Sequence, residues 1–290
     1  MAELRNKIIK KIKYYAEAVM FSHTVFSLTF ALLAMVVAAN GLPNARTIFF
    51  ILLALVSGRT GANAINRVID RKYDKKNERT SDRHLPSGKV QPYELVLLTV
   101  ACYAVFVFSA YMLNPLCFFL SPVAILLFTI YSYTKRFTFL CHLVLGFTCA
   151  GAPVGAWFAV TGEFSLIPFI LACAVMLWIA GFDIIYGTQD IEFDRANNLF
   201  SIPQTFGLKW SLIIAKAFHF LMIIILAAFG YIVKMGWLYY VGLVAATGLL
   251  FLQHNIVNPK DKRLMKIASY NLNQIISIII CVCGIVDVWV

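Results

Sequence analysis

The chain has 290 residues, of which 61% are hydrophobic and 13% are charged. A soluble domain is nearer half apolar and a quarter charged, so this composition excludes an ordinary soluble protein and predicts a polytopic membrane protein. The seven cysteines lie in apolar segments without paired spacing. We therefore expect neither a disulfide framework nor a zinc site.

Nine apolar segments are each close to the roughly 20 residues that a helix needs to cross a bilayer. They cover residues 17–39, 46–66, 92–113, 115–134, 142–161, 165–187, 210–232, 236–254 and 268–289. We expect one all-α transmembrane domain over residues 1–290, with nine membrane-spanning helices. Residues 1–16 precede it as a basic amphipathic helix on the membrane surface.

The net charge of +11 could indicate a nucleic-acid partner, but its distribution argues against one. Basic residues gather in the N-terminal segment and in the loop after the second span, whereas Arg46 and Lys234 stand alone on the opposite side. By the positive-inside rule, the N-terminus and the polar loops are cytoplasmic and the C-terminus lies across the membrane. We predict a multi-pass protein of a bacterial-type inner membrane, with no nucleic-acid partner, and we infer no obligatory protein partner.

Near the cytoplasmic end of the first span, His23 stands in the sequence FSHT. One interpretation is a core histidine with its hydrogen bonds satisfied. The other is a side chain that lines a site, because His23 lies at the depth of the polar motifs described next. Further along, Gly146, Gly151, Pro153 and Gly155 in the fifth span allow close approach of another helix or a bend.

Two stretches repeat the same polar spacing of seven and then four residues. The first holds Asn63, Asn66, Asp70 and Asp74, and the second holds Asp183, Asp190 and Asp194. Residues at these steps share one face of a helix, so each stretch predicts a stripe of oxygen ligands at the end of an apolar helix. Asp183 lies inside an apolar run, where a carboxylate costs about 2.5–3.5 kcal/mol and normally marks a site.

Basic and hydroxyl side chains surround these stretches. Residues 67–91 and 188–209 are predicted to form cytoplasmic cap loops, which hold the candidate ligand-binding residues Arg79, Arg83 and Arg195. At the end of the fourth span, Tyr131, Lys135 and Arg136 could bind an anion or could be an ordinary positive-inside cluster.

Oxygen ligands on two facing helices suit Mg²⁺, which commonly binds carboxylates together with substrate phosphates. Basic residues at the rim complete a pocket for a diphosphate, and the apolar bundle accommodates a long hydrocarbon. If the diphosphate is allylic, its departure leaves a stabilised carbocation that an electron-rich aromatic ring can attack. No nucleophilic serine or cysteine is required.

The motifs also resemble those of the UbiA superfamily of membrane prenyltransferases. Asn66-x3-Asp70-x3-Asp74 with the following Arg-x-Leu-Pro-Ser-Gly is similar to its first signature, and the Asp183, Asp190 and Asp194 series is similar to its second. Tyr131-x3-Lys135-Arg136 is similar to the tyrosine–lysine motif of the same family. Asn66 followed by Arg67, in place of the more frequent Asn-Asp, is most similar to the 4-hydroxybenzoate-prenyltransferase-like subgroup, which includes members of the futalosine route to menaquinone.

The resemblance implies an all-α membrane protein of nine transmembrane helices around a central cavity with a cytoplasmic cap. It also implies Mg²⁺-dependent transfer of a polyprenyl chain from polyprenyl diphosphate to an aromatic acid in ubiquinone or menaquinone biosynthesis. Its implied metal ligands are Asn66, Asp70, Asp74, Asp190 and Asp194. It also assigns Lys135 and Arg136 to diphosphate binding.

We expect Asp70, Asp190 and Asp183 to be catalytic, with Asp183 orienting the acceptor, assisting proton loss, or only satisfying a neighbouring helix. Two alternatives remain open from the residues. One is a transporter of organic ions, and the other is a different enzyme acting on a lipid diphosphate.

Overall fold

The computed structural model describes residues 11, 13–19 and 24–290, and within them the secondary structure is entirely helical. Eight helices are long and apolar enough to cross a membrane in the described part of the chain. The helices of the bundle are α3 (Ala45–Lys76), α4 (Pro92–Leu113), α5 (Pro115–Thr134), α6 (Cys141–Thr161), α7 (Ile167–Gly187), α9 (Ile202–Ile232), α10 (Trp237–Ile256) and α12 (Leu272–Asp287). The predicted all-α, multi-pass fold is confirmed.

The count of eight refers to the described residues, in which the first predicted span is only partly covered. Its described part, α2 (Thr24–Ala39), has 16 residues. The prediction began this span at residue 17, and residues 20–23 lie outside the described part of the chain. His23 and most of the predicted surface helix at 1–16 lie outside it as well.

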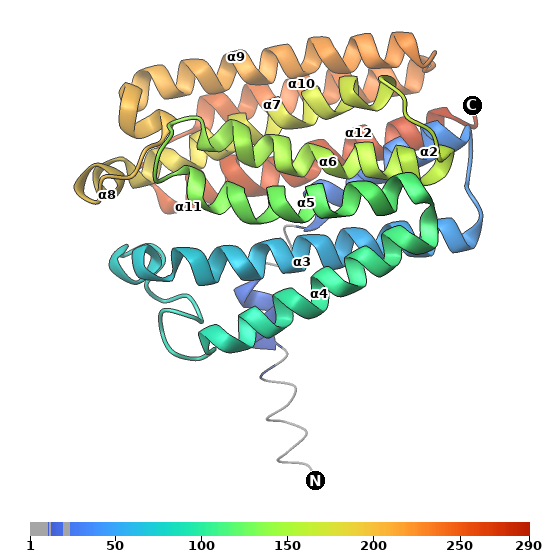
Figure 1. Ribbon diagram of the computed structural model, residues 1–290. Coiled ribbons are helices and arrows are strands. Elements are labelled where there is room, and N and C mark those ends of the chain that lie inside the picture. Colours follow the sequence, from blue (N-terminus) through green and yellow to red (C-terminus); the bar gives the residue numbers. More distant parts are fainter. Residues whose placement is uncertain (1–10, 12, 20–23) are drawn as a thin grey trace, which may run out of the picture.

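The helices run alongside one another and place both motif segments at one end of the bundle (Figure 1). At that end lie the last turns of α3, the 3₁₀-helix η2 (Thr188–Asp190), α8 (Ile191–Ala196) and α11 (Lys262–Lys266). From α11 the chain continues through the π-helix η3 (Ile267–Asn271) into α12. The C-terminus lies at the opposite end of the bundle (Figure 1). The two motifs therefore share a side, and the C-terminus is on the other, as predicted.

The length of α3 explains why the first motif lies at the membrane surface. Its 32 residues span roughly 48 Å at 1.5 Å per residue, whereas the hydrocarbon core is about 30 Å thick. Asn44 caps the start of the helix, where its side chain accepts a hydrogen bond from the Thr47 amide, and Asn77 caps its end. Residues 67–76 of the predicted cap loop are thus helical, and the cap segment covers residues 77–91.

The second motif follows a change of helix type. The helix α7 ends at Gly187, and the chain then passes through η2 and α8 before α9 begins. Early in α9 the helix bends at Gly207, whose φ of 72° lies in the left-handed region that glycine adopts without strain. The predicted cap at residues 188–209 therefore consists mainly of short helical segments.

The main apolar core packs α2, α6, α7, α9, α10 and α12 around the fully buried Trp178. Close contact between α6 and α7 requires Gly146, because a Cβ there would lie 2.3 Å from the backbone oxygen of Met176. A Cβ at Gly151 or Gly155 would meet nothing within 4 Å among the described residues. Of the three glycines predicted to allow close approach, Gly146 is the one whose missing side chain makes room for another helix.

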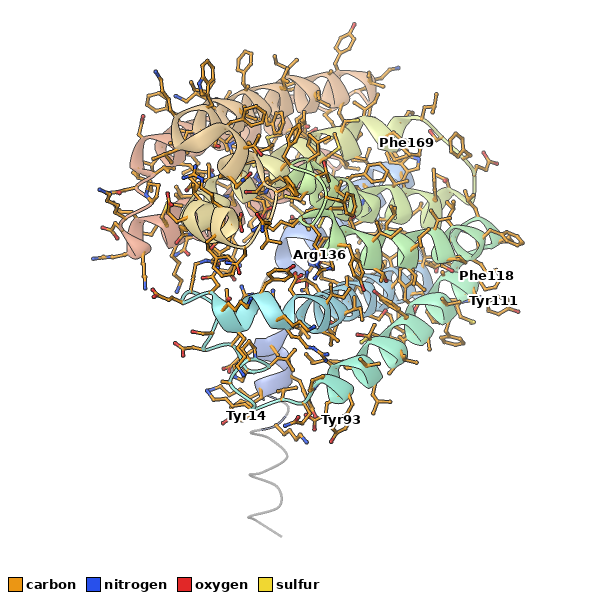
Figure 2. The ribbon with its side chains drawn as sticks, turned by 60° about the vertical axis from the view of Figure 1, so that its left-hand side comes forward. Tyr14, Tyr93, Tyr111, Phe118, Arg136 and Phe169 are labelled. Atoms are coloured by element: carbon orange, nitrogen blue, oxygen red, sulfur yellow. The ribbon has the colours of Figure 1, made fainter. Side chains whose placement is uncertain are left out.

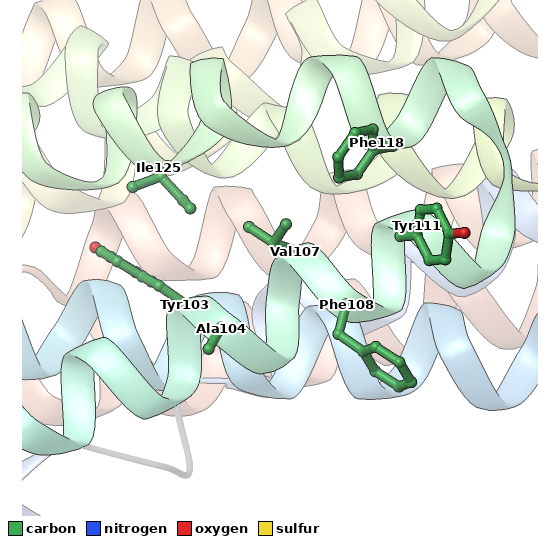
Figure 3. Close-up of a pocket in the computed structure, with 7 residues that line it drawn as sticks. All are labelled: Tyr103, Ala104, Val107, Phe108, Tyr111, Phe118 and Ile125. Atoms are coloured by element: carbon green, nitrogen blue, oxygen red, sulfur yellow. The ribbon is translucent and has the colours of Figure 1, made fainter.

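On the outer surface, α4 and α5 enclose an apolar groove of about 580 Å³ lined by Tyr111, Phe118 and five other residues (Figure 3). Tyr111 is 65% exposed, which is expected for an aromatic side chain that faces lipid. The N-terminal segment packs near the other edge of α4, where Glu17 lies 3.0 Å from the His84 ring in the cap segment.

Candidate active site

The two motif segments meet in a cavity of about 80 Å³. Its lining comes from the end of α3, the cap segment, the α5–α6 loop and the η2–α8 segment. The lining residues are Asp70, Tyr73, Asp74, Asn77, Arg79, Thr80, Lys135, Arg136, Asp190, Phe193 and Leu199. Figure 2 labels Arg136 in this region, between the end of α3 and the α8 segment. Side chains that are 120 residues apart in the sequence thus line one cavity.

On the α3 wall, Asp70 is held by one neighbour from α3 itself and one from the α5–α6 loop. Asn66 Nδ2 donates to Asp70 Oδ2 at 2.8 Å and to Ser132 Oγ at 3.2 Å. Arg136 Nη2 donates to Asp70 Oδ1 at 3.1 Å and to the Ile69 carbonyl at 3.0 Å. The α5–α6 loop is therefore fastened to the first motif by a basic side chain.

One turn further along α3, Asp74 binds the cap segment. Arg83 Nη1 donates to Asp74 Oδ1 at 2.7 Å, and Arg67 Nη1 lies 3.4 Å from Asp74 Oδ2. Burial, and then the charge of Arg67, lower the pKa of Arg83 to about 10, so this guanidinium stays charged at neutral pH. Thr80 Oγ1 also donates to the Asp74 carbonyl at 2.9 Å.

Asp190 joins the two motif segments directly. Arg79 binds it through two donors, Nε to Oδ1 at 3.0 Å and Nη2 to Oδ2 at 2.5 Å, and Asn77 Nδ2 donates to Oδ1 at 2.9 Å. Arg79 also donates to the Tyr186 hydroxyl at 2.5 Å. Burial by itself would lower the pKa of Arg79, but the hydrogen bonds and charge of Asp190 outweigh it and raise the pKa.

Asp194 is fully buried and pairs with the α5–α6 loop. Lys135 Nζ lies 2.8 Å from Asp194 Oδ1, and Ser201 Oγ donates to Oδ2 at 2.9 Å. Burial opposes the charge of Lys135, yet the charges of Asp194 and Asp190 prevail and raise its pKa. The Phe200 amide donates to the Lys135 carbonyl at 2.7 Å, which fixes this loop against the second motif.

These donors suit a magnesium–diphosphate unit better than a bare metal ion. Within the described residues, no three acidic, cysteine or histidine side chains form a ready-made metal cluster. Four carboxylates instead each pair with a basic side chain in or beside the cavity. Hard oxygen donors fit Mg²⁺, and the neighbouring arginines and lysine fit phosphate oxygens, so the residues present fit the group.

Several predicted site residues lie elsewhere. The Arg195 side chain is 60% exposed and pairs with Glu192 at 3.6 Å, outside the cavity. Asn63 donates to the Val19 carbonyl at 2.7 Å and so fixes the N-terminal segment. Tyr131 lies deeper, within electrostatic range of Arg59. Asp183 lies on the face of α7 that leads to the cavity, and it contacts His142.

Sequence reasoning missed two buried groups below the cavity. Arg59 lies in the middle of α3, where its Nη1 donates to Cys149 Sγ at 3.0 Å and its Nε has no hydrogen-bond partner among the described residues. A cation inside an apolar span is the sequence signal that should have identified it. His142, the partner of Asp183, gives no comparable signal because the contact joins two helices.

The fold and the cavity define a multi-pass membrane protein that brings acidic and basic side chains from two distant segments together at one end of its bundle. The chain belongs to the UbiA prenyltransferase family, which it matches over residues 27–275. It is therefore a prenyltransferase, and this prediction from the motifs is confirmed. The family assignment also favours the enzyme over the transporter that the sequence left open.

Relatives match most of the chain. The 4-hydroxybenzoate octaprenyltransferase of Photobacterium profundum is 28% identical over 268 residues, which are 91% of this chain and 93% of that protein. The enzyme of the same name from Vibrio cholerae is 31% identical over 229 residues, 79% of this chain and 80% of that protein.

Solved structures share the fold. The apo structure of a UbiA homologue from Aeropyrum pernix K1 has a TM-score of 0.84 and 30% identity, over 92% of this chain and 98% of that one. A UbiA homologue from Archaeoglobus fulgidus, solved with GPP and Mg²⁺, has a TM-score of 0.70 and 19% identity, over 96% of this chain and 100% of that one.

Proposed function

We propose that this protein transfers a polyprenyl group from polyprenyl diphosphate to an aromatic acid of the 4-hydroxybenzoate type, with Mg²⁺ as the metal, in ubiquinone or menaquinone biosynthesis. The observation that carries the proposal is the convergence of both acidic segments and three basic side chains on one cavity. The names of the bacterial relatives support the substrate class, and the A. fulgidus structure with GPP and Mg²⁺ supports the ligand pair.

The ion pairs of the cavity suggest how its residues receive a charged ligand. Each acid faces a base, so a unit that contains both a cation and an anion can enter between them without leaving a buried charge uncompensated. Asn66, Asp70, Asp74, Asp190 and Asp194 would hold the metal. When bound, Mg²⁺ supplies Lewis-acid stabilisation of the negative charge that develops on the departing diphosphate.

The basic side chains bind the diphosphate itself. Arg79, Lys135 and Arg136 all line the cavity. The raised pKa values of Arg79 and Lys135 keep these two side chains charged at neutral pH. Once an anion competes for them, these donors turn from the carboxylates to phosphate oxygens. They then stabilise the negative charge that grows as the carbon–oxygen bond of the allylic diphosphate breaks.

The carboxylate of the aromatic acceptor needs a separate cation, which Arg59 provides. This guanidinium lies in the interior of α3, and within the described residues no carboxylate lies within ion-pair distance of it. An arginine inside an apolar span, with Cys149 and Tyr131 near it and no carboxylate partner among the described residues, favours an anionic ligand. The acceptor would therefore lie on the membrane side of the diphosphate, with its acid group toward Arg59.

A product assay tests the proposal. Purified protein is incubated with Mg²⁺, prenyl diphosphates of several lengths and a set of aromatic acids, and the product masses and connectivities are determined. We expect an aryl–prenyl carbon–carbon bond with 4-hydroxybenzoate or a close analogue. Release of free phosphate, or a new phosphodiester without that bond, would instead support another enzyme acting on a lipid diphosphate.

We also propose that the cavity faces the cytoplasm, as the positive-inside distribution suggests. Single cysteines placed at the exposed Lys76 and Lys234 provide a matched pair, because the first lies at the end of α3 and the second lies in the loop before α10. In sealed right-side-out vesicles, an impermeant thiol reagent should label the cysteine at 234 and not the cysteine at 76. The reverse pattern would contradict the orientation.

A further inference from the structure

A histidine–aspartate pair lies one level below the diphosphate cavity. His142, at the start of α6, places Nδ1 2.7 Å from Asp183 Oδ2 on α7. The histidine side chain is only 4% exposed, whereas the aspartate side chain is 27% exposed. The His142 ring is thus buried in the protein interior, whereas the Asp183 carboxylate is partly exposed.

The position of Asp183 on its helix gives the direction of that open space. Asp183, Tyr186 and Asp190 are three and seven residues apart, so they share one face of the chain as it leaves α7. Tyr186 and Asp190 both bind Arg79, which lines the cavity. Asp183 therefore lies below the cavity at a distance of roughly 10 Å along the helix.

The 2.7 Å contact determines how the pair is protonated. Two lone pairs would repel at this distance, so the proton between the atoms belongs to Nδ1 of His142, which donates to the carboxylate. His142 Nε2 has no hydrogen-bond partner among the described residues. The imidazole thus holds Asp183 Oδ2 through Nδ1, and no described residue donates a hydrogen bond to Oδ1.

The ring of His142 is itself held in place by its surroundings. A Cβ at Gly187 would lie 3.1 Å from His142 Cε1, so the glycine gives the ring room to pack against α7. A side chain with this little freedom can define the direction in which the Asp183 carboxylate points. Arg59 and its partner Cys149 lie further along α6 from His142. Cys149 comes seven residues, or about two helical turns, after His142 and so lies on the same face of this helix.

We propose that Asp183 Oδ1 accepts a hydrogen bond from the ring hydroxyl of the aromatic acceptor and that His142 is the positioning residue that aims this carboxylate. The inference rests on the proposed function and adds the group that recognises the hydroxyl. A carboxylate at the hydroxyl also raises the electron density of the ring, which favours its attack on an allylic cation. A hydrogen bond to a charged group contributes roughly 10- to 100-fold in affinity.

The test compares two ligands that differ in the hydroxyl alone. Binding of 4-hydroxybenzoate and of benzoate is measured on purified wild-type protein and on variants, together with KM for the prenyl diphosphate. Wild-type protein should prefer 4-hydroxybenzoate by roughly 10- to 100-fold. In Asp183→Asn the amide would accept from His142 and present its NH₂ to the ligand, so the preference should fall to within about threefold. The KM for the prenyl diphosphate should change less than about twofold in every variant.

Three histidine variants test whether His142 acts through Asp183. His142→Met removes the donor and His142→Gln moves its amide one bond further from the backbone than Nδ1, so the hydroxyl preference should fall about tenfold in both. His142→Asn places an N–H donor near the position of Nδ1 and should restore most of the preference. Adding His142→Met to Asp183→Asn should cost no further preference, because both changes remove the same interaction.

The outcomes separate this inference from the function on which it rests. An unchanged preference in the Met and Gln variants, equal losses in Asn and Met, or losses that add in the double variant would each overturn the inference. Should the Met variant not fold, the Asn and Gln variants make the same comparison. If wild-type protein forms no aryl–prenyl product with any aromatic acid, the proposed function fails, whatever the variants do.

Discussion

Replacing Arg79 with methionine tests the link between the two motif segments. Arg79 binds Asp190 through two donors and Tyr186 through a third, and the exposed fractions of the Arg79 and Asp190 side chains are 24% and 8%. Breaking a buried ion pair costs about 3–5 kcal/mol when the remaining charge has no other partner. Here Asn77 still donates to Asp190 and Arg79 is partly hydrated, so we expect a loss of about 2–3 kcal/mol.

In Arg79→Met, the loss of turnover should exceed what the loss of unfolding free energy alone would cause. Arg79 faces the position where negative charge develops on the diphosphate, and removing one such donor typically costs about 100- to 1,000-fold in turnover. Arg195→Met is the matched control, because Arg195 is 60% exposed, pairs only weakly with Glu192 and lies outside the cavity. Turnover and thermal unfolding of both variants are measured with prenyl diphosphate and acceptor. Near-normal turnover in Arg79→Met, or an equal loss in Arg195→Met, would refute the reasoning.

Three further predictions concern other parts of the molecule. Arg59→Met should raise KM for the aromatic acid at least about tenfold and leave KM for the prenyl diphosphate unchanged, and steady-state kinetics with each substrate varied checks this. Gly146→Ala should destabilise the protein by about 1–3 kcal/mol, because its Cβ would lie 2.3 Å from the Met176 oxygen; Gly151→Ala, which meets nothing among the described residues, should leave the unfolding temperature unchanged or slightly higher. Chelation should abolish prenyl transfer and Mg²⁺ should restore it, whereas Ca²⁺, a larger ion that prefers more ligands, should restore little.

The sequence predicted the fold and the main chemistry because both depend on strong local patterns. Apolar runs of bilayer length located the spans, and the repeated seven-and-four spacing located Asp70, Asp74, Asp190 and Asp194. Helix length was harder to predict, since α3 continues ten residues into the predicted loop. Polar residues there keep a helical conformation because their side chains bind the cap segment rather than water alone.

Pairing between distant residues could not be predicted from these patterns. Nothing local distinguishes Arg79, which reaches the cavity, from Arg195, which points to solvent. Likewise Asn63 keeps the helical spacing of the first motif, yet it faces the N-terminal segment, because a helix face is wider than one stripe. The contact between His142 and Asp183 joins two helices 41 residues apart in sequence and appears only once both are packed.

The central claim is that the Asp70 segment and the Asp190 segment bind the same ligand. Binding of inorganic pyrophosphate in the presence of Mg²⁺ tests this claim most directly. Isothermal titration of wild-type, Asp70→Asn and Asp190→Asn protein measures this binding without any need for turnover. We predict metal-dependent binding to the wild type and a loss of at least about 100-fold in each variant, since each wall contributes ligands to the same ions. Wild-type affinity in either variant would contradict the account.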